Sequence, residues 1–187
     1  MIEPMFDAVL GIDPGLSRCG YGAVGIEDGR PRAVAAGVIR TPVDEPVPQR
    51  LVRLLTELES LLDDIGPTAV AVERVLFQTN ARTAIPVGQA SGLALVTAAR
   101  RGIEVVEYSP NEVKLAVTGD GRADKVAVQS MVTRLLGLAV PPQPPDAADA
   151  LALALTHLWR GEAIPQGGPS TSGFERAVAV ALGKETS

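Results

Sequence analysis

The stretch Ala8-Val9-Leu10-Gly11-Ile12-Asp13-Pro14-Gly15 is an apolar run that ends in a carboxylate and is stopped by a Pro-Gly pair. Such a run predicts a buried β-strand, and Pro14-Gly15 turns the backbone away at its end. Two further strands are predicted at 20–26 and 33–39, and the Asp28-Gly29 pair between them is a turn signal. The chain therefore opens with a predicted three-stranded meander.

After residue 48 the pattern changes to an alternation of helix and strand. Leucines at three- and four-residue spacings predict an amphipathic helix that ends near Gly66. Two short apolar runs, 69–72 and 103–106, predict further strands, and the first of them leads into Glu73. Further helices are predicted at 81–101, 110–117, 123–136 and 146–160. A meander followed by this alternation predicts an α/β fold with a mixed five-stranded sheet and helices on both faces.

The length and composition favour one folded domain. The chain has 187 residues, of which 46% are hydrophobic and 21% charged, and this is ordinary globular composition. Beyond Gly161 the sequence becomes rich in Gly, Pro, Ser and Thr, which is typical of a flexible segment. We therefore predict a domain over 1–160 and a flexible tail over 161–187, with a short helix at 174–182.

The charge and the single cysteine limit the possible functions. The formal net charge of -5 excludes a general electrostatic attraction to DNA, RNA or anionic membranes, so binding to nucleic acid would need a local basic surface. Cys19 is the only cysteine, which excludes an internal disulfide framework and a cysteine-based zinc site. The start lacks a basic signal region, and no apolar run reaches the ~20 residues that cross a bilayer. We expect a cytoplasmic protein without a membrane anchor.

Four acidic residues stand out by their positions. Asp13 and Glu73 each end an apolar strand, and Asp146 and Asp149 lie three residues apart at the start of an Ala- and Leu-rich helix. Three elements thus each bring carboxylate out of an apolar stretch, and carboxylate oxygens are the ligands that hard cations such as Mg²⁺ require. Four such groups would repel one another without a cation, so a cluster of them implies a bound metal.

Simpler interpretations of the same residues stay open. Asp13 also suits a turn, Asp146 suits a helix N-cap, Asp149 suits the first turn of a helix, and Glu73 could pair with Arg74 at the surface. A second motif, Gly20-Tyr21-Gly22-Ala23-Val24-Gly25, matches the G-x-G-x-x-G pattern of dinucleotide loops by its letters. It lies in a predicted strand and opens no helix, and phosphate binding by that motif needs a helix N-terminus.

Four blocks of the sequence, in this order, resemble the RuvC family of crossover junction endonucleases. They are Gly11-Ile12-Asp13-Pro14-Gly15, then Ala71-Val72-Glu73-Arg74-Val75, then Val113-Lys114 with 117–125, and finally 146–152. The resemblance runs from about Leu10 to Trp159. The first block alone also resembles actin-like ATPases and other ribonuclease H-like proteins, whereas the set of four is specific.

The resemblance implies a ribonuclease H-like fold and a homodimer that resolves four-way (Holliday) junctions by paired, symmetric nicks in DNA recombination and repair. It implies that Asp13, Glu73, Asp146 and Asp149 are catalytic acids that bind Mg²⁺, with two ions in each active site and Mn²⁺ as a substitute. The chemistry agrees, because two cations ~3.5–4 Å apart can serve both the attacking water and the leaving oxygen of a phosphodiester. A base such as His157, the only histidine, is then not required, and we interpret His157 as structural.

The resemblance also assigns residues to DNA binding. Lys114 and Lys125 match the family's phosphate-contacting lysines, and the glycine turn 119–121 would let the backbone approach DNA, beside a helix N-terminus that can accept a phosphate. The family carries a base-stacking aromatic residue after the Glu73 block, where this chain has Leu76 and then Phe77. The segment that follows adds Asn80 and Arg82 as candidate backbone contacts.

Partners and alternative functions complete the prediction. The small residues at 88–92 suit a dimer surface, although tight packing within one subunit explains them equally well. The resemblance further implies a junction-bound branch-migration complex of the RuvA and RuvB type as a partner. Two other functions stay open at this point: a non-catalytic junction-binding scaffold that retains the fold, and an actin-like nucleotide-binding protein.

Overall fold

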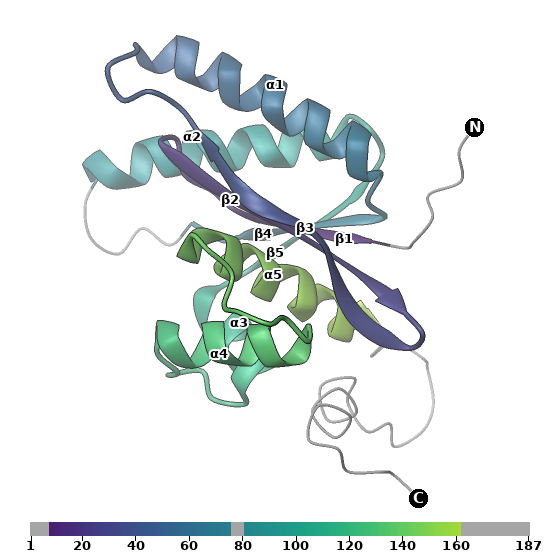
Figure 1. The fold of residues 1–187 in the computed structure, drawn as a ribbon. Helices are drawn as coiled ribbons and strands as arrows, with labels where there is room; N and C mark the ends of the chain where they lie inside the picture. The colour runs from purple at the N-terminus through teal and green to yellow at the C-terminus, as the bar shows by residue number, and fades with distance from the viewer. Residues whose placement is uncertain (1–7, 76–80, 162–187) are drawn as a thin grey trace, which may run out of the picture.

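The computed structural model describes residues 8–75 and 81–161, which form one sheet and the helices around it (Figure 1). The strands are β1 (Val9–Asp13), β2 (Arg18–Glu27), β3 (Arg30–Arg40), β4 (Ala69–Glu73) and β5 (Glu104–Tyr108). The helices are α1 (Val47–Ile65), α2 (Ala81–Ala99), α3 (Pro110–Thr118), α4 (Lys125–Leu135) and α5 (Pro145–Gly161).

The sheet is mixed, and its strand order is β3-β2-β1-β4-β5. The opening meander pairs β1 with β2 and β2 with β3, both antiparallel, around the turn at Asp28 and Gly29. Strand β4 then joins β1 in parallel, and β5 joins β4 in parallel. Because β1 and β4 run in the same direction, their carboxyl ends lie at the same rim of the sheet.

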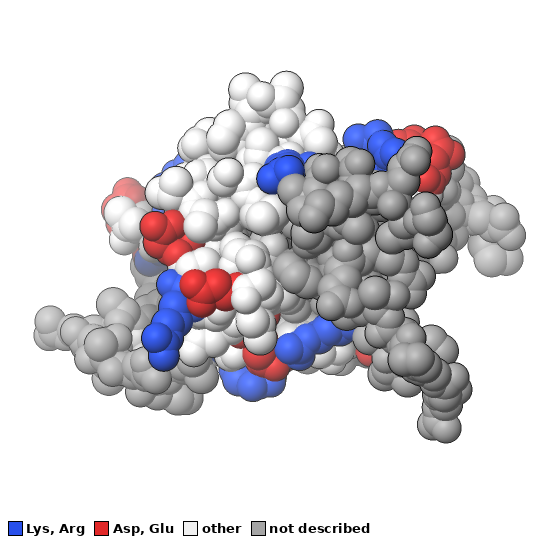
Figure 2. All heavy atoms as spheres, turned by 90° about the horizontal axis from the view of Figure 1, so that it is seen from below, with Lys and Arg blue, Asp and Glu red and all other residues white. Residues whose placement is uncertain are grey.

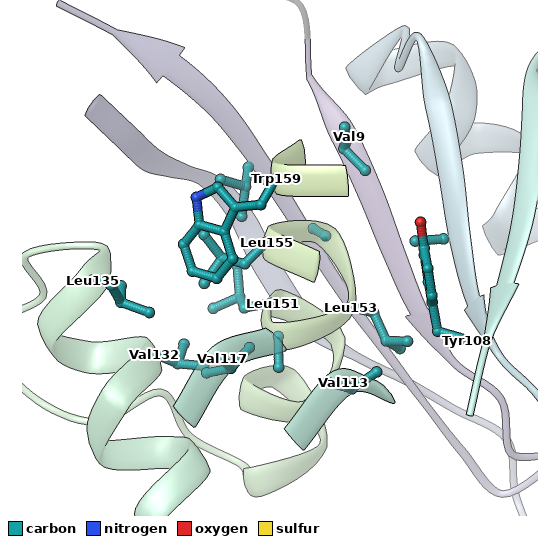
Figure 3. Close-up of a cluster of buried hydrophobic side chains, with 14 of the residues drawn as sticks. Val9, Tyr108, Val113, Val117, Val132, Leu135, Leu151, Leu153, Leu155 and Trp159 are labelled. Atoms are coloured by element: carbon teal, nitrogen blue, oxygen red, sulfur yellow. The ribbon is translucent and has the colours of Figure 1, made fainter. Parts of the chain in front are cut away.

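The sheet separates two hydrophobic cores (Figure 1). On one face α1 and α2 cover the sheet, and Leu54, Leu58 and Leu62 of α1 form part of that core. On the other face α5 lies against β1 and β2, and α3 and α4 pack outside it. Figure 3 shows this second core, in which Leu151, Leu155 and Trp159 of α5 lie among side chains of α3 and α4.

Helix α5 lies unusually close to the sheet because the strands beneath it carry glycine. A Cβ atom added to Gly11 would come within 1.9 Å of the carbonyl oxygen of Ala150, and one added to Gly20 within 2.3 Å of that of Asp146. At Gly22 the nearest atoms, 2.7 Å away, belong to Leu151. No side chain fits between the backbones at these points, so the three glycines set the distance between helix and sheet.

The predicted fold class is confirmed: the described residues form a mixed five-stranded sheet with helices on both faces. The G-x-G-x-x-G letters at 20–25 lie inside β2 and open no helix, so their glycines serve the contact with α5. The predicted helix at 174–182 and the rest of the tail lie outside the described residues, and the boundary at residue 160 stays a prediction. No helix of the described part is long and apolar enough to span a membrane.

Candidate active site

Asp13 and Glu73 end neighbouring parallel strands at the same rim of the sheet. Ile12 of β1 pairs with Val72 of β4, so the two acids follow at the same level. Side chains alternate between the faces of a strand, and Ile12 and Val72 both belong to the core under α1 and α2. Asp13 and Glu73 therefore project to the opposite face, where α5 lies.

Asp146 and Asp149 come to this rim from the first turns of α5. The residues between and after them, Ala147, Ala148 and Ala150, are buried, whereas both aspartates are half-buried. The contact between Gly20 and the backbone of Asp146 fixes the start of the helix over the end of β1, because Gly20 pairs with Asp13. The four acids predicted to form the site thus gather where β1, β4 and α5 meet.

The acids lie close enough together for their charges to shift one another's pKa. Burial and the nearby charges of Glu73, Asp149 and Asp146 raise the pKa of Asp13 from 3.8 to about 7. The pKa of Glu73 is also raised, first by burial and then by the charge of Asp149. A raised pKa means that too little positive charge lies near the carboxylate to stabilise its ionised form. A bound cation would supply that charge.

Three basic side chains now supply part of that charge. Lys125, the first residue of α4, donates from Nζ to Oδ2 of Asp149 at 3.0 Å. Arg18, the first residue of β2, donates from Nε to Oδ2 of Asp146 at 3.1 Å, and its Nη2 contacts the same oxygen. Lys114 of α3 forms no such bond among the described residues, but its charge lowers the pKa of Glu73.

The acids fit a divalent cation by their chemistry, although not in their present side-chain positions. Four carboxylates with at least two raised pKa values are a donor set for a hard cation. Nevertheless, no three His, Cys, Asp or Glu side chains of the described residues are arranged so that they could hold a metal ion. Asp146 and Asp149 are instead paired through Oδ2 with Arg18 and Lys125, and these partners would compete with a cation for the two carboxylates.

The loop between Asp13 and Arg18 is held from beneath by buried polar groups. Thr41 donates from Oγ1 to the carbonyl oxygen of Leu16 at 2.5 Å. Arg50 of α1, although charged, is buried and donates to Oγ1 of Thr41 at 3.0 Å and to Oγ of Ser17 at 2.5 Å. The backbone that joins β1 to β2 is therefore fixed on the side away from α5.

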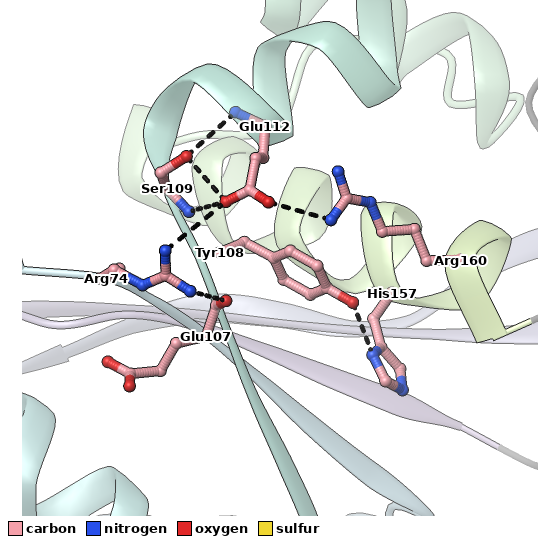
Figure 4. Close-up of polar contacts among 7 residues, drawn as sticks. All are labelled: Arg74, Glu107, Tyr108, Ser109, Glu112, His157 and Arg160. Carbon is pink, nitrogen blue, oxygen red and sulfur yellow. Dashed lines mark hydrogen bonds and ion pairs between the residues drawn. The ribbon is translucent and has the colours of Figure 1, made fainter.

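A second polar network lies at the carboxyl ends of β4 and β5, directly after Glu73 (Figure 4). Arg74, which follows Glu73, donates from Nη2 to the carbonyl oxygen of Glu107 at 3.0 Å, and its guanidinium lies 3.9 Å from Glu112. Glu112 accepts bonds from Ser109 and, at 3.0 Å, from Nη1 of Arg160. The backbone and hydroxyl bonds from Ser109, with the Arg160 charge, lower the pKa of Glu112 to about 2.

His157 belongs to this network and lies apart from the acids. Its Nδ1 lies 2.9 Å from the hydroxyl oxygen of Tyr108, and Arg160 lies over the ring of that tyrosine. Burial lowers the pKa of His157, which favours the neutral ring. These contacts agree with the structural interpretation of this residue.

Of the residues predicted to bind DNA, Lys114 and Lys125 lie beside the acids. Lys125 is exposed, and Lys114 is half-buried on α3. The N-terminus of α4 next to them is capped by Asp124, which accepts a bond from the backbone of Ala127 at 2.8 Å. That cap occupies an amide that was expected to be available to a phosphate. Leu76, Phe77 and Asn80 lie outside the described residues, as does the side chain of Arg82 at the start of α2.

The surface near α3 and α4 is not a continuous basic patch. Seen from below, acidic and basic side chains lie next to one another there, and much of the visible surface is uncharged (Figure 2). The largest acidic surplus, six acids against two arginines over residues 44–64, belongs to α1 and the segment before it, on the face opposite α5. This local surplus of acidic side chains is therefore directed away from the site.

Arg18 and the glycines under α5 belong to the site or support it, although no motif of the sequence marks them for this role. Arg18 follows Asp13 by five residues, across a turn, at the start of an antiparallel strand. A strand that returns from a turn begins at the rim where the previous strand ended, and this rule could have placed Arg18 beside Asp13. The glycines carried no such signal, because the element that packs on them begins more than a hundred residues later.

Comparisons with known proteins agree on one family. The model of the family described as crossover junction endodeoxyribonuclease RuvC matches residues 9–157. The crossover junction endodeoxyribonuclease RuvC of Thermobifida fusca is 52% identical over 174 residues, covering 92% of this chain and 96% of that protein. That of Streptomyces avermitilis is 51% identical over 177 residues, covering 94% and 97%. The solved structure of T. thermophilus RuvC in complex with Holliday junction substrate has a TM-score of 0.79 at 38% identity, over 83% of this chain and 95% of that one.

Proposed function

Because the chain belongs to the RuvC family of crossover junction endodeoxyribonucleases, which resolve Holliday junctions, we propose that the carboxylates of Asp13, Glu73, Asp146 and Asp149 form its catalytic centre. The chain is an endonuclease of DNA recombination and repair, and it acts on junction DNA. The observation that carries the assignment is the convergence of the four acids at one rim, with the pKa of Asp13 raised to about 7 by burial and by its three acidic neighbours.

Nucleases of this family depend on a metal ion, and we propose Mg²⁺, two ions for each site, with Mn²⁺ as a substitute. The all-oxygen donor set supports this choice, because hard cations prefer carboxylate. When bound, such ions supply an activated water and stabilise the leaving oxygen of the phosphodiester. The chain itself contributes the four acids that bind and orient, on elements fixed to one another by the glycine contacts of α5.

Lys114 and Lys125 are proposed to bind the phosphates of the junction next to the acids. Lys125 is well exposed, with 79% of its side-chain surface accessible, although it is paired with Asp149. With Asp149 bound to a cation, the ammonium group of Lys125 would be available to a phosphate of the DNA. Phe77, Asn80 and Arg82 are proposed as further DNA contacts from the segment after Glu73, with Phe77 or Leu76 stacking on a base.

We propose that the active protein is a homodimer that cuts both strands symmetrically and uses α2 as its interface. A Cβ added to Gly88 or Gly92 would meet no atom within 4 Å, so packing within the subunit does not require these glycines. Ile85 and Val96 of the same helix are exposed at 60% and 48%. Glycines and apolar residues on an exposed helix face favour close contact with another helix, and a two-fold dimer supplies two identical sites.

A junction-bound branch-migration complex of the RuvA and RuvB type is the proposed partner, and the cytoplasm the proposed location. The two proposals are linked. A resolvase acts on a junction that other proteins form and bind, and it must be in the compartment that contains the chromosome. The proposed partner is tested by asking whether a branch-migration complex and this protein bind the same synthetic junction and are recovered together.

The catalytic assignment is tested with a synthetic four-way junction and a linear duplex, each with and without Mg²⁺. We expect symmetric nicks in the junction alone and only with Mg²⁺. Asp13→Asn and Asp146→Asn are expected to retain junction binding and to lose nicking by at least about 100-fold, because each removes a charge from the cation site. Glu57→Gln, which removes an exposed acid on α1, is the matched control and is expected to cut normally. Unchanged cleavage by Asp13→Asn would disprove the proposed centre.

A further inference from the structure

Arg18 binds the carboxylate of Asp146, for which a metal ion would compete. Its Nε and Nη2 both contact Oδ2 of Asp146. Asp146 begins α5 over the end of β1, because its backbone contacts Gly20 and Gly20 pairs with Asp13. A guanidinium group and a divalent cation cannot both lie against the same side of one carboxylate, because the two positive charges repel. A cation bound on this side of Asp146 would therefore compete with Arg18 for the carboxylate.

A place for the released guanidinium exists beside it. Arg18 pairs with Arg40 across the β2–β3 ladder, directly opposite it. Like charges at opposite positions of a ladder are destabilising, and the side chain of Arg40 forms no hydrogen bond or ion pair with another described residue that would offset this. Two neighbouring guanidinium groups at the rim that carries the acids form a group suited to a phosphate, which Arg binds through two parallel hydrogen bonds.

The backbone of this segment is held while the side chain can move. Thr41 and Arg50 fix Leu16 and Ser17 through buried hydrogen bonds, and Arg18 begins the paired part of β2. The side chain of Arg18 keeps 43% of its surface accessible. A change of rotamer can therefore carry its guanidinium from Asp146 to the solvent side of the rim without disturbing the sheet.

We propose that Arg18 is a switch between the acids and the DNA: it pairs with Asp146 in the metal-free protein and, when a divalent cation takes Asp146, binds the junction backbone together with Arg40. This inference rests on the proposed metal site. It adds a DNA-binding role for two arginines of β2 and β3, whereas Lys114 and Lys125 lie on α3 and α4.

The first test measures Mn²⁺ binding without DNA, by calorimetry, for the wild type, Arg18→Ala, Arg18→Gln and Arg40→Ala. Loss of the competing ion pair should make both Arg18 variants bind Mn²⁺ about two- to fivefold more tightly, which is the size of effect that an exposed ion pair allows. Arg40→Ala is the matched control, because Arg40 does not contact Asp146, and its Mn²⁺ affinity should equal that of the wild type. Equal or weaker Mn²⁺ binding by both Arg18 variants would overturn the proposal.

The second test measures junction binding with Ca²⁺ in place of Mg²⁺, over a range of salt concentrations. Arg18→Ala and Arg40→Ala should each weaken binding and each reduce the slope of log affinity against log salt by about 0.9, the value for one lost phosphate contact. An unchanged slope for Arg18→Ala would show that Arg18 does not contact a DNA phosphate. Asp146→Asn distinguishes the two proposals: if it binds Mn²⁺ as the wild type does, the metal site itself is wrong, whatever the arginine variants do.

Discussion

At the scale of single residues, Asp13 and Glu112 show how the surroundings of a carboxyl group decide its charge. Asp13 is half-buried beside three other acids, and its pKa rises to about 7. Glu112 closes a capping box with Ser109 and accepts a bond from Arg160, and its pKa falls to about 2. The carboxylate of Asp13 lacks positive charge that an added cation would supply, whereas the carboxylate of Glu112 already has its hydrogen-bond donors and a positive charge. Only the first is therefore suited to bind something from outside.

The Glu112 network predicts a stability difference that depends on pH. A folded-state pKa below the unfolded value of 4.5 means that the ionised carboxylate stabilises the folded state above pH 4.5 and that this contribution is lost between pH 4.5 and about 2. Glu112→Gln should therefore lower the free energy of unfolding by about 1 kcal/mol at pH 7, a value reduced for partial exposure, and by little at pH 2. Urea unfolding at several pH values, with Glu57→Gln as the control, measures this. A loss that is equal at pH 7 and pH 2 would contradict it.

At the scale of elements, the contact of α5 with β1 and β2 is what brings two acids of a helix to two acids of a sheet. The helix is buried on nearly all sides, between the sheet and α3 with α4. Its distance from the sheet is set by glycine, so a single methyl group in the contact would displace the whole helix. The position of Asp146 and Asp149 therefore depends on residues that take no part in the chemistry.

Gly22→Ala tests this dependence. The new Cβ would lie 2.7 Å from the backbone nitrogen of Leu151, which cannot move without the helix, so we expect a loss of about 1–3 kcal/mol in the free energy of unfolding. Metal binding should weaken as well, since Asp146 and Asp149 move with α5. Gly121→Ala is the control: its nearest contact would be an ordinary 3.5 Å, and its stability should change little. If Gly22→Ala were as stable as Gly121→Ala, the glycines would not set the helix position.

The elements themselves could be predicted from the sequence, and the contacts between them only in part. Apolar runs and leucine spacings identify β1, β4 and α1 because burial imposes the period of each element locally. The four acids could be found because each interrupts such a pattern. The pairing of Arg18 with Asp146 joins residues 128 positions apart, and nothing local encodes it. The pKa of Asp13 likewise depends on three elements at once.

At the scale of the whole molecule, the sheet divides the protein into a face with the acids and a face with α1 and α2. The acidic surplus of residues 44–64 lies on the second face, which agrees with the proposal that a chain with a net charge of -5 acts on DNA with the first. The sequence gives the segment charges but not which face carries them, because that depends on the packing of α1. The proposed dimer interface on α2 is also on the second face.

This division predicts that the dimer can be disrupted without damage to the fold. Gly92→Arg places a long charged side chain on the open face of α2, where a Cβ meets no atom of its own subunit. We expect its dimer dissociation constant to rise at least tenfold, with the unfolding of the monomer little changed and paired cuts replaced by single nicks. Analytical ultracentrifugation measures the first effect. Val52→Arg, at an exposed position of α1, is the control, and an equal rise there would argue against α2 as the specific interface.

The single tryptophan of the chain, Trp159, lies buried in the core between α5 and its neighbours, and the core under α1 and α2 has none (Figure 3). Intrinsic fluorescence excited at the indole thus observes one half of the molecule, whereas circular dichroism observes the helices of both. A lag between the two signals during denaturation would reveal that the halves melt separately. The protein thereby carries an unlabelled optical probe on the half that bears the acids.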